Sequence, residues 1–102
     1  MLNEIADVEA TMSGMGGREL TEAAQTIDEL VQAIVGEIVD YPESISTLVV
    51  ESGSTIVVEL TVAREDIGKV IGRQGSMARS LRTILSNAAT KLSRRSVLQI
   101  IE

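Results

Sequence analysis

Apolar positions recur at intervals of three and four residues through the first half of the chain. This spacing predicts one amphipathic helix, because it places the apolar side chains on a single helical face. The helix begins near Thr21 or near Thr26, since both are N-cap residue types, and it ends at Pro42, because a residue before proline avoids helical angles. Its apolar positions are Leu20, Ala23, Ala24, Ile27, Leu30, Val31, Ile34, Val35 and Ile38.

The pattern then changes to an alternation of apolar and polar residues. Residues 45–51 are short and β-branched, Ser52-Gly53-Ser54 is a turn, and residues 55–62 place Ile56, Val58 and Leu60 on one side. These segments predict a β-hairpin with one buried face.

Helical spacing returns in the second half of the chain. Residues 65–71 predict a short helix with two acids in its first turn, and a longer helix follows Gly75. The longer helix carries an apolar stripe of Met77, Leu81, Ile84, Leu85, Ala88 and Leu92. Residues 96–101 predict a last strand. The order helix, strand, strand, helix, helix, strand predicts an α+β fold in which helices pack on one face of a three-stranded sheet.

The 102 residues suffice for one domain. Residues 13–17 are rich in glycine and mark a boundary, so we expect residues 1–19 to form a flexible acidic N-terminal tail, with Glu4, Asp7 and Glu9, and residues 20–102 to form the folded domain.

The composition excludes several kinds of chemistry. The chain has no Cys and no His, which removes disulfides, thiolate nucleophiles and the side chains most often used for metal binding and acid-base catalysis. Tyr41 is the only aromatic residue, so no platform of stacked rings can form. No apolar run approaches the roughly 20 residues of a membrane span. We therefore predict a cytoplasmic binding protein, with no enzymatic activity, small-molecule substrate, cofactor or metal.

The net charge of −6 hides a strong asymmetry between two halves of the chain. Residues 1–63 contain one base and twelve acids, for a net charge of −11, whereas residues 64–102 contain eight bases and three acids, for a net charge of +5. Such asymmetry indicates a charged partner, and the basic half suits an anion.

The basic half contains Gly72-Arg73-Gln74-Gly75 between its two predicted helices. Glycine at both ends allows backbone conformations that other residues avoid and lets a ligand approach the main chain closely. The amide groups at the start of the second helix attract anions, and Arg73 and Gln74 can donate hydrogen bonds to phosphate oxygens. A Gly-x-x-Gly segment alone also fits a plain interhelical turn, so its context decides its meaning.

That context resembles the KH domain in its type II arrangement. Besides Val-Ile-Gly-Arg-Gln-Gly, residues 30–35, 40–43 and 62–69 are similar to the small bacterial single-KH proteins of the KhpA-like family, and the resemblance covers roughly residues 28–102. It implies a Gly-x-x-Gly loop that clamps the backbone of about four nucleotides of single-stranded RNA. It also implies a homodimer, or a heterodimer with a second, larger KH-domain protein, and a role as an RNA chaperone or post-transcriptional regulator. Arg64 departs from the family pattern, in which a proline often opens the short helix.

Several residues around the loop are further candidates for RNA contact. We expect Lys69, Ile71, Ser76 and Arg79 to contribute, and Ile71 with a residue of strand 55–62 to form an apolar floor for the bases. Arg82 and Ser86 lie opposite the apolar stripe of the long helix and could line the path of the RNA, although exposed bases on a helix are usually only solvated.

Two alternative functions remain open from the sequence. One is a KH fold that pairs with another KH protein and whose loop binds no RNA. The other is a DNA-binding helix-turn-helix, since two helices across a short glycine-containing turn fit that pattern as well.

Overall fold

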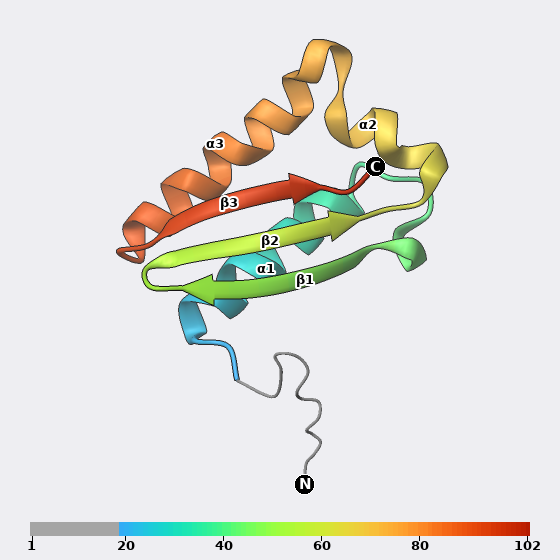
Figure 1. Ribbon diagram of the computed structural model, residues 1–102. Coiled ribbons are helices and arrows are strands. Elements are labelled where there is room, and N and C mark those ends of the chain that lie inside the picture. The colour runs from blue at the N-terminus through green and yellow to red at the C-terminus, as the bar shows by residue number, and fades with distance from the viewer. Residues whose placement is uncertain (1–18) are drawn as a thin grey trace, which may run out of the picture.

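The computed structural model describes residues 19–102, so the expected tail lies outside the described residues apart from Glu19. The order of elements is the predicted one, and the α+β fold class is confirmed (Figure 1). The helices and strands are α1 (Glu22–Gly36), β1 (Ser46–Ser52), β2 (Thr55–Thr61), α2 (Ile67–Ile71), α3 (Ser76–Lys91) and β3 (Arg95–Ile100). Single 3-10 turns lie at Pro42–Ser44, Arg64–Asp66 and Arg73–Gly75.

The three strands form one sheet in the order β1-β2-β3. β1 and β2 are the predicted antiparallel hairpin, which turns at Gly53 with a φ of 58°. β3 runs parallel to β2. Two parallel neighbours need a long crossover connection, and the segment with α2 and α3 provides it. β2 is therefore the central strand, and β1 and β3 are the two edges.

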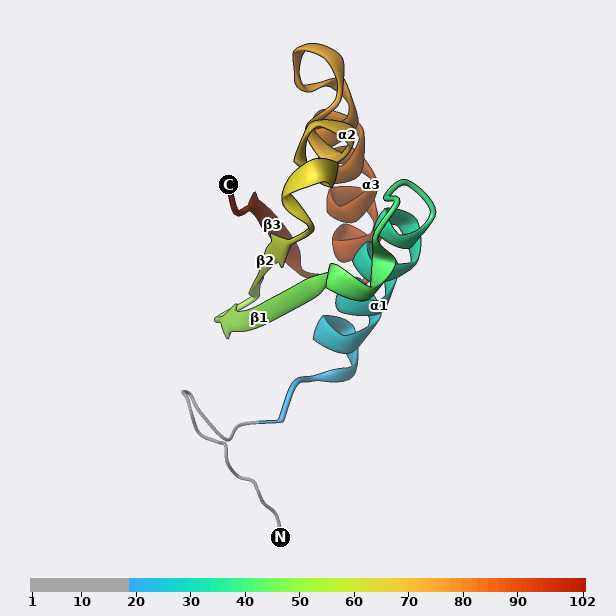
Figure 2. The same ribbon diagram turned by 90° about the vertical axis from the view of Figure 1, so that its right-hand side faces the viewer.

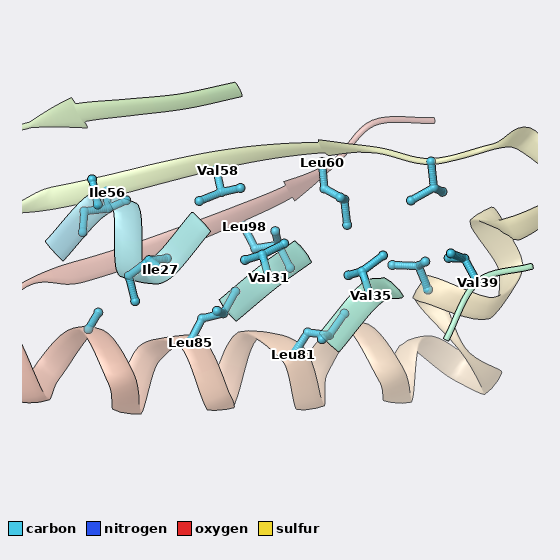
Figure 3. Close-up of a cluster of buried hydrophobic side chains, with 14 residues drawn as sticks. Ile27, Val31, Val35, Val39, Ile56, Val58, Leu60, Leu81, Leu85 and Leu98 are labelled. Atoms are coloured by element: carbon cyan, nitrogen blue, oxygen red, sulfur yellow. The ribbon is translucent and has the colours of Figure 1, made fainter. Parts of the chain in front are cut away.

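The helices pack on one face of the sheet, as predicted, and Figure 2 shows α1 and α3 on the same side of the three strands. The core lies between these layers, where the inward side chains of β2 meet the apolar stripes of α1 and α3 (Figure 3). Its fully buried members include Ile27, Val31, Val35, Ile56, Val58, Leu60, Leu81 and Leu85. None of the helices in the described part of the chain is long and apolar enough to cross a membrane.

The first helix begins at one of the two predicted places but ends earlier than predicted. Thr21 is the N-cap, and its hydroxyl accepts a hydrogen bond from the Ala24 N–H at 3.2 Å. The helix ends at Gly36 and not at Pro42. Glycine is a poor helix former, and the chain beyond it turns back on itself through the N–H groups of Ile38 and Val39, both of which donate to the Val35 carbonyl.

A buried carboxylate holds the segment that follows. The Asp66 side chain is 0% exposed and accepts hydrogen bonds from the backbone N–H groups of Asp40 and Tyr41, each at 3.0 Å. The sequence places Asp66 in the first turn of the short helix, where an acid favours the helix dipole, whereas the structure gives it a different task. It connects the turn after α1 to the start of α2.

One residue of the predicted stripe on the long helix lies outside the core. Ile84 is 44% exposed, while Ala78 and Ala89 are buried in its place beside Leu81 and Leu85. The helix buries positions separated by three and four residues, and Ile84 directly precedes Leu85, so it points about 100° away from that row.

The opposite face of the sheet is covered by none of the described helices. Val50, Val57 and Val97 are cross-strand partners in one row on this face, and Leu48 lies beside them. Leu48, Val50 and Val97 are 58%, 47% and 41% exposed. The outer face therefore carries an exposed apolar patch, with Glu59 and Gln99 beside Leu48 in the neighbouring row.

Candidate nucleic-acid interface

The loop at residues 72–75 stands at one end of the molecule, beyond the sheet, in both views of the chain (Figures 1 and 2). Three of its four residues have a positive φ: Gly72 at 78°, Gln74 at 55° and Gly75 at 77°. The Gly75 N–H donates to the Gly72 carbonyl at 3.1 Å and closes the loop. Arg73 and Gln74 are both exposed at its tip. The two glycines thus occupy positive-φ positions, as the sequence predicts.

Gly72 is required for a second reason, which is space. A Cβ added there would lie 2.6 Å from both the Met77 Cβ and the Met77 backbone nitrogen. The loop backbone therefore packs directly against the first turn of α3. At Gly75 an added Cβ would meet, among residues 19–102 and beyond its chain neighbours, just the Arg79 Nη1 at 3.5 Å, so there the positive φ is what favours glycine.

Arg79 supports the loop from within α3. Its Nη1 donates to the Gln74 carbonyl at 3.1 Å, which helps to hold Gln74 in its positive-φ conformation. The side chain is exposed, so the remaining guanidinium N–H groups still face solvent. No described side chain caps the N-terminus of α3, and Ser76, its first residue, is exposed.

Lys69 and Ile71 lie on α2 just before the loop. The Lys69 Nζ is 2.7 Å from Asp40 Oδ2 and 3.8 Å from the buried Asp66 Oδ1. The hydrogen bond and the negative charge of Asp40 raise the pKa of Lys69 above its ordinary value. The Lys69 ammonium group is therefore positively charged and already paired with carboxylates of the protein. Ile71 is half-buried beside the loop.

A hollow of about 300 Å³ lies between α3 and the edge strand β3. We call it the edge hollow, and it is lined by Arg82, Ser86, Ser96, Val97 and Leu98. Arg79, Arg82 and Ser86 follow one another along α3 at intervals of three and four residues, so the loop and the edge hollow share one side of this helix.

The structure places the predicted loop residues Gly72, Arg73, Gln74 and Gly75 together, with Ile71, Ser76 and Arg79 around them. The apolar floor expected from strand 55–62 stays a prediction. The inward residues Ile56, Val58 and Leu60 are fully buried in the central strand, and the strand that lies beside α3 is β3.

Sequence reasoning missed the contribution of β3 to the edge hollow. A single sequence does not reveal which strand lies at the edge next to α3, because that depends on the parallel pairing of β2 with β3. The available signal was the return of a strand after a helical crossover, which favours parallel pairing with an earlier strand.

Arg94 is engaged at the other end of the domain. Its guanidinium lies 3.3 Å from Glu51 Oε1, which also accepts a hydrogen bond from the Thr21 hydroxyl at 2.9 Å. This basic residue therefore belongs to the start of α1 and not to the loop. Within residues 19–102 no group of three or more acidic side chains is placed to hold a metal ion.

Comparison with known protein families gives one matching family. The model described as "KhpA/KhpB, KH domain" matches residues 28–100, which include the second part of α1, all of α3, the whole sheet and the loop.

Several bacterial proteins resemble the chain over the same region, and each is named "RNA-binding protein KhpA". The protein of Caldanaerobacter subterraneus is 41% identical over 73 residues, which is 72% of this chain and 97% of that one. The protein of Aquifex aeolicus is 40% identical over 76 residues, or 74% and 96% of the two chains. That of Listeria monocytogenes is 36% identical over 76 residues, or 74% and 100%.

Proposed function

The chain belongs to the KhpA/KhpB KH-domain family, and from this premise we propose that it binds single-stranded RNA through the loop at residues 72–75. The family resemblance and the KH-type fold expected from the sequence are confirmed. The family is one of binding proteins, so the prediction of a non-enzymatic chain is confirmed as well.

The observation that carries the proposal is the backbone of the loop. Gly72 and Gly75 leave the main chain without side chains at the start of α3. The N–H groups of Gly75 and Ser76 donate to the carbonyls of Gly72 and Arg73, and no described side chain takes up the amide groups that follow them. Backbone N–H groups and the positive end of a helix dipole favour a phosphate there. Arg73 and Gln74, both exposed between the glycines, supply further donors.

The other predicted residues contribute to RNA binding in different ways in this proposal. Ser76 and Arg79 follow the loop on α3, where the Ser76 hydroxyl and the free N–H groups of Arg79 extend the donor surface. Ile71 provides an apolar contact next to the loop. Lys69 contributes mainly positive charge, because its ammonium group is shared with Asp40.

The proposal is tested with the double variant Arg73→Asp/Gln74→Asp. Two negative charges at the tip should repel phosphate, so we expect loss of binding to a labelled single-stranded RNA in a fluorescence anisotropy titration. The matched control is Lys91→Asp/Gln25→Asp, which makes the same change of charge at exposed helix positions, away from both the loop and the outer face of the sheet. Equal binding by the two variants would reject the clamp.

The affinity should depend strongly on salt if phosphate contacts dominate. For single strands the logarithm of the binding constant falls with the logarithm of salt concentration by about 0.7 per phosphate neutralised. Arg73→Ala should therefore make the slope shallower by roughly that amount. An unchanged slope would mean that Arg73 makes no phosphate contact.

We also propose that the chain pairs, either with itself or with a second, larger KH-domain protein. Two observations support pairing: the family description joins KhpA with KhpB, and the outer face of the sheet carries an exposed apolar patch that no described helix covers. Pairing would bring two RNA-binding loops together and raise the effective concentration of the second contact. Light scattering after gel filtration gives the mass, and a monomer at all concentrations would reject self-pairing.

The cellular role that fits these properties is that of a cytoplasmic RNA chaperone or post-transcriptional regulator. The alternative is a pairing module whose loop does not contact RNA. It predicts that the Arg73→Asp/Gln74→Asp variant retains RNA as the wild type does but loses pairing, which would lower the mass measured by light scattering. The helix-turn-helix alternative is disfavoured, because α2 has five residues and a three-stranded sheet accompanies the helices.

A further inference from the structure

The apolar patch on the outer face of the sheet crosses all three strands. Val50, Val57 and Val97 are cross-strand partners, so their side chains form one row. Leu48 lies two residues before Val50 on the edge strand β1, and the two side chains are 58% and 47% exposed. Exposed apolar side chains gathered in one place favour a covering partner, because contact with it removes their surface from water.

An exposed cation borders the patch at the end of the sheet where the hairpin turns. Arg95 is the cross-strand partner of Thr55 and lies on the same face as Val97, two residues further along β3. Within residues 19–102 it forms no ion pair. Glu59 lies on this face too, but at the far side of the valine row. The face therefore favours an occupant with an apolar side and negative charge near Arg95.

The described chain begins beside the same end of the sheet. The backbone N–H and the hydroxyl of Thr21 both donate to the Glu51 carboxylate on β1, each at 2.9 Å. Arg94, which directly precedes Arg95, donates to the Thr21 hydroxyl at 3.4 Å. Figure 1 shows the blue start of the described chain close to the arrowhead of β1. The residues before Thr21 are therefore tethered next to the cationic end of the patch.

The sequence before Thr21 has the chemistry that the patch favours. We call residues 2–12 the N-terminal segment. Its apolar residues recur at intervals of three and four, the spacing of one helical face, at Leu2, Ile5, Val8 and Met12. Its charged residues are three acids, Glu4, Asp7 and Glu9, and it contains no base. An apolar stripe with negative charge complements both the valine row and Arg95.

The dimensions of the segment and of the face agree. A helix over residues 2–12 is about 16 Å long and about 10 Å wide. The face from Arg95 to Gln99 is about 13 Å long, and three strands are about 10 Å across. Residues 13–20 join the segment to Thr21 and reach about 28 Å when extended. This reach suffices to pass around the single edge strand β1, because the layers on the two sides of a sheet are each about 10 Å thick.

The tether favours this segment over a second copy of the chain. A segment held by a short linker is present at its docking face at an effective concentration on the order of millimolar. A free second copy at micromolar concentration would have to bind the patch about a thousand-fold more tightly to displace it.

We propose that the N-terminal segment forms an amphipathic helix that docks on the outer face of its own sheet, with the apolar stripe on Val50, Val57 and Val97. Docking covers the patch that also supports pairing, so pairing through this face requires the segment to leave. In this arrangement only the linker, residues 13–20, keeps the freedom expected of the whole tail.

A spin label on the segment tests the docking in the full-length chain. The protein has no cysteine, so Asn3→Cys provides a single attachment site for a nitroxide on the polar side of the segment. In nitrogen-15 spectra, we expect the amide signals of Val57 and Val97 to lose more than half of their intensity relative to the reduced label. The signals of Ser80 and Asn87, exposed on α3 and not on the sheet, should keep theirs.

A mixed sample distinguishes the chain's own segment from that of another copy. Spin-labelled protein without nitrogen-15 is added to nitrogen-15 protein without a spin label, so any loss of signal reports contact between two copies. We expect no loss at Val57 or Val97 in this sample.

Variants of the segment test its apolar stripe. Ile5→Asn/Val8→Asn removes two apolar side chains from the stripe and should abolish the loss of signal at the outer face. The matched control is Ala6→Asn/Ala10→Asn, which makes the same replacement on another side of the segment and should retain the loss. All four positions precede residue 28, where the family match begins, so these variants leave the KH domain itself unchanged.

Several results would overturn the docking. One is a loss of signal that is absent, or equal on the two sides of the domain, and another is a loss that survives Ile5→Asn/Val8→Asn. A loss in the mixed sample would mean that a second copy supplies the occupant. A loss centred on residues 72–75 would place the acidic segment at the basic loop instead. None of these measurements uses RNA, so docking and the RNA clamp stand or fall separately.

Discussion

The ammonium group of Lys69 lies 2.7 Å from Asp40 Oδ2, and this contact ties the helix before the loop to the turn after α1. Both side chains are about half exposed or more, at 46% and 65%. A cation in such a pair has to leave its carboxylate, or share it, before it can contact a phosphate. Lys69 is close to the loop in the sequence, but its pairing with Asp40 should make its contribution to RNA affinity smaller than that position suggests.

We predict that Lys69→Ala weakens RNA binding less than Arg73→Ala does. Both variants remove one positive charge, but only Arg73 is exposed at the tip of the loop. Anisotropy titrations of the two variants at the same low salt concentration measure the difference. A larger loss for Lys69→Ala would show that the ion pair opens on binding and that Lys69 contacts RNA directly.

Asp66 is predicted to be a principal determinant of stability near the loop. Asp66→Asn replaces one acceptor oxygen with an NH₂ group, which then faces the backbone N–H of Asp40 or Tyr41. A buried donor left without a partner costs about 1–3 kcal/mol, so the urea midpoint should fall clearly.

The matched control for this change is Asp40→Asn. It removes only the exposed pair with Lys69 and keeps the backbone N–H that Asp66 accepts, so its cost should stay within about 1 kcal/mol. Equal losses for the two variants would mean that the ion pair, and not the buried carboxylate, holds the turn.

Two glycines are predicted to respond to alanine with opposite signs. At Gly36 an added Cβ meets nothing within 4 Å in the described chain, and the residue is helical, so Gly36→Ala should stabilise the protein by up to about 1 kcal/mol. At Gly72 the positive φ and the 2.6 Å approach to Met77 make Gly72→Ala destabilising, by about 1–3 kcal/mol.

Thermal melting of both variants tests the pair. For a domain of this size each kcal/mol corresponds to roughly 4–8 °C in Tm. A lower Tm for Gly36→Ala would indicate that another chain approaches the backbone there. An unchanged Tm for Gly72→Ala would mean that the loop has a second conformation with room for a side chain.

The elements could be predicted because each has a strong local signal. Alternation in residues 55–62, the capping residue Thr21 and the glycines at 72 and 75 act over a few positions, and the structure reproduces them to within one or two residues. The end of α1 could not be placed in the same way. Pro42 is the stronger sequence signal, but the helix stops at Gly36, and the amide groups of Asp40 and Tyr41 further along donate to the distant Asp66 instead of continuing the helix.

The parts of the candidate site that escaped prediction depend on distant contacts. Asp66 looks like any acid in the first turn of a helix, and its burial arises only when the segment after α1 folds against it. The contact between Arg82 and Leu98 spans sixteen residues and requires β3 to be a parallel edge strand. Neither periodicity nor motif spacing contains this information.

Glu51 is predicted to contribute to the loss of stability of the folded domain in acid. The hydrogen bond from the Thr21 backbone N–H, at 2.9 Å, is the main cause that lowers the pKa of Glu51 below its ordinary value of 4.5, and Arg94 adds to the effect. A carboxyl group with a lowered pKa in the folded state stabilises that state above the pKa of the unfolded chain, and this contribution disappears as the pH falls through the folded pKa. We therefore expect the wild type to exceed Glu51→Gln in urea midpoint at neutral pH, and the gap to narrow as the pH is lowered past 4.5. Arg94→Gln keeps the hydrogen bonds between Thr21 and Glu51. The difference in urea midpoint between the wild type and this variant should therefore be smaller, and it should also narrow in acid. A gap that stays constant or widens in acid would contradict this assignment and would place the acid-sensitive carboxylates elsewhere in the domain.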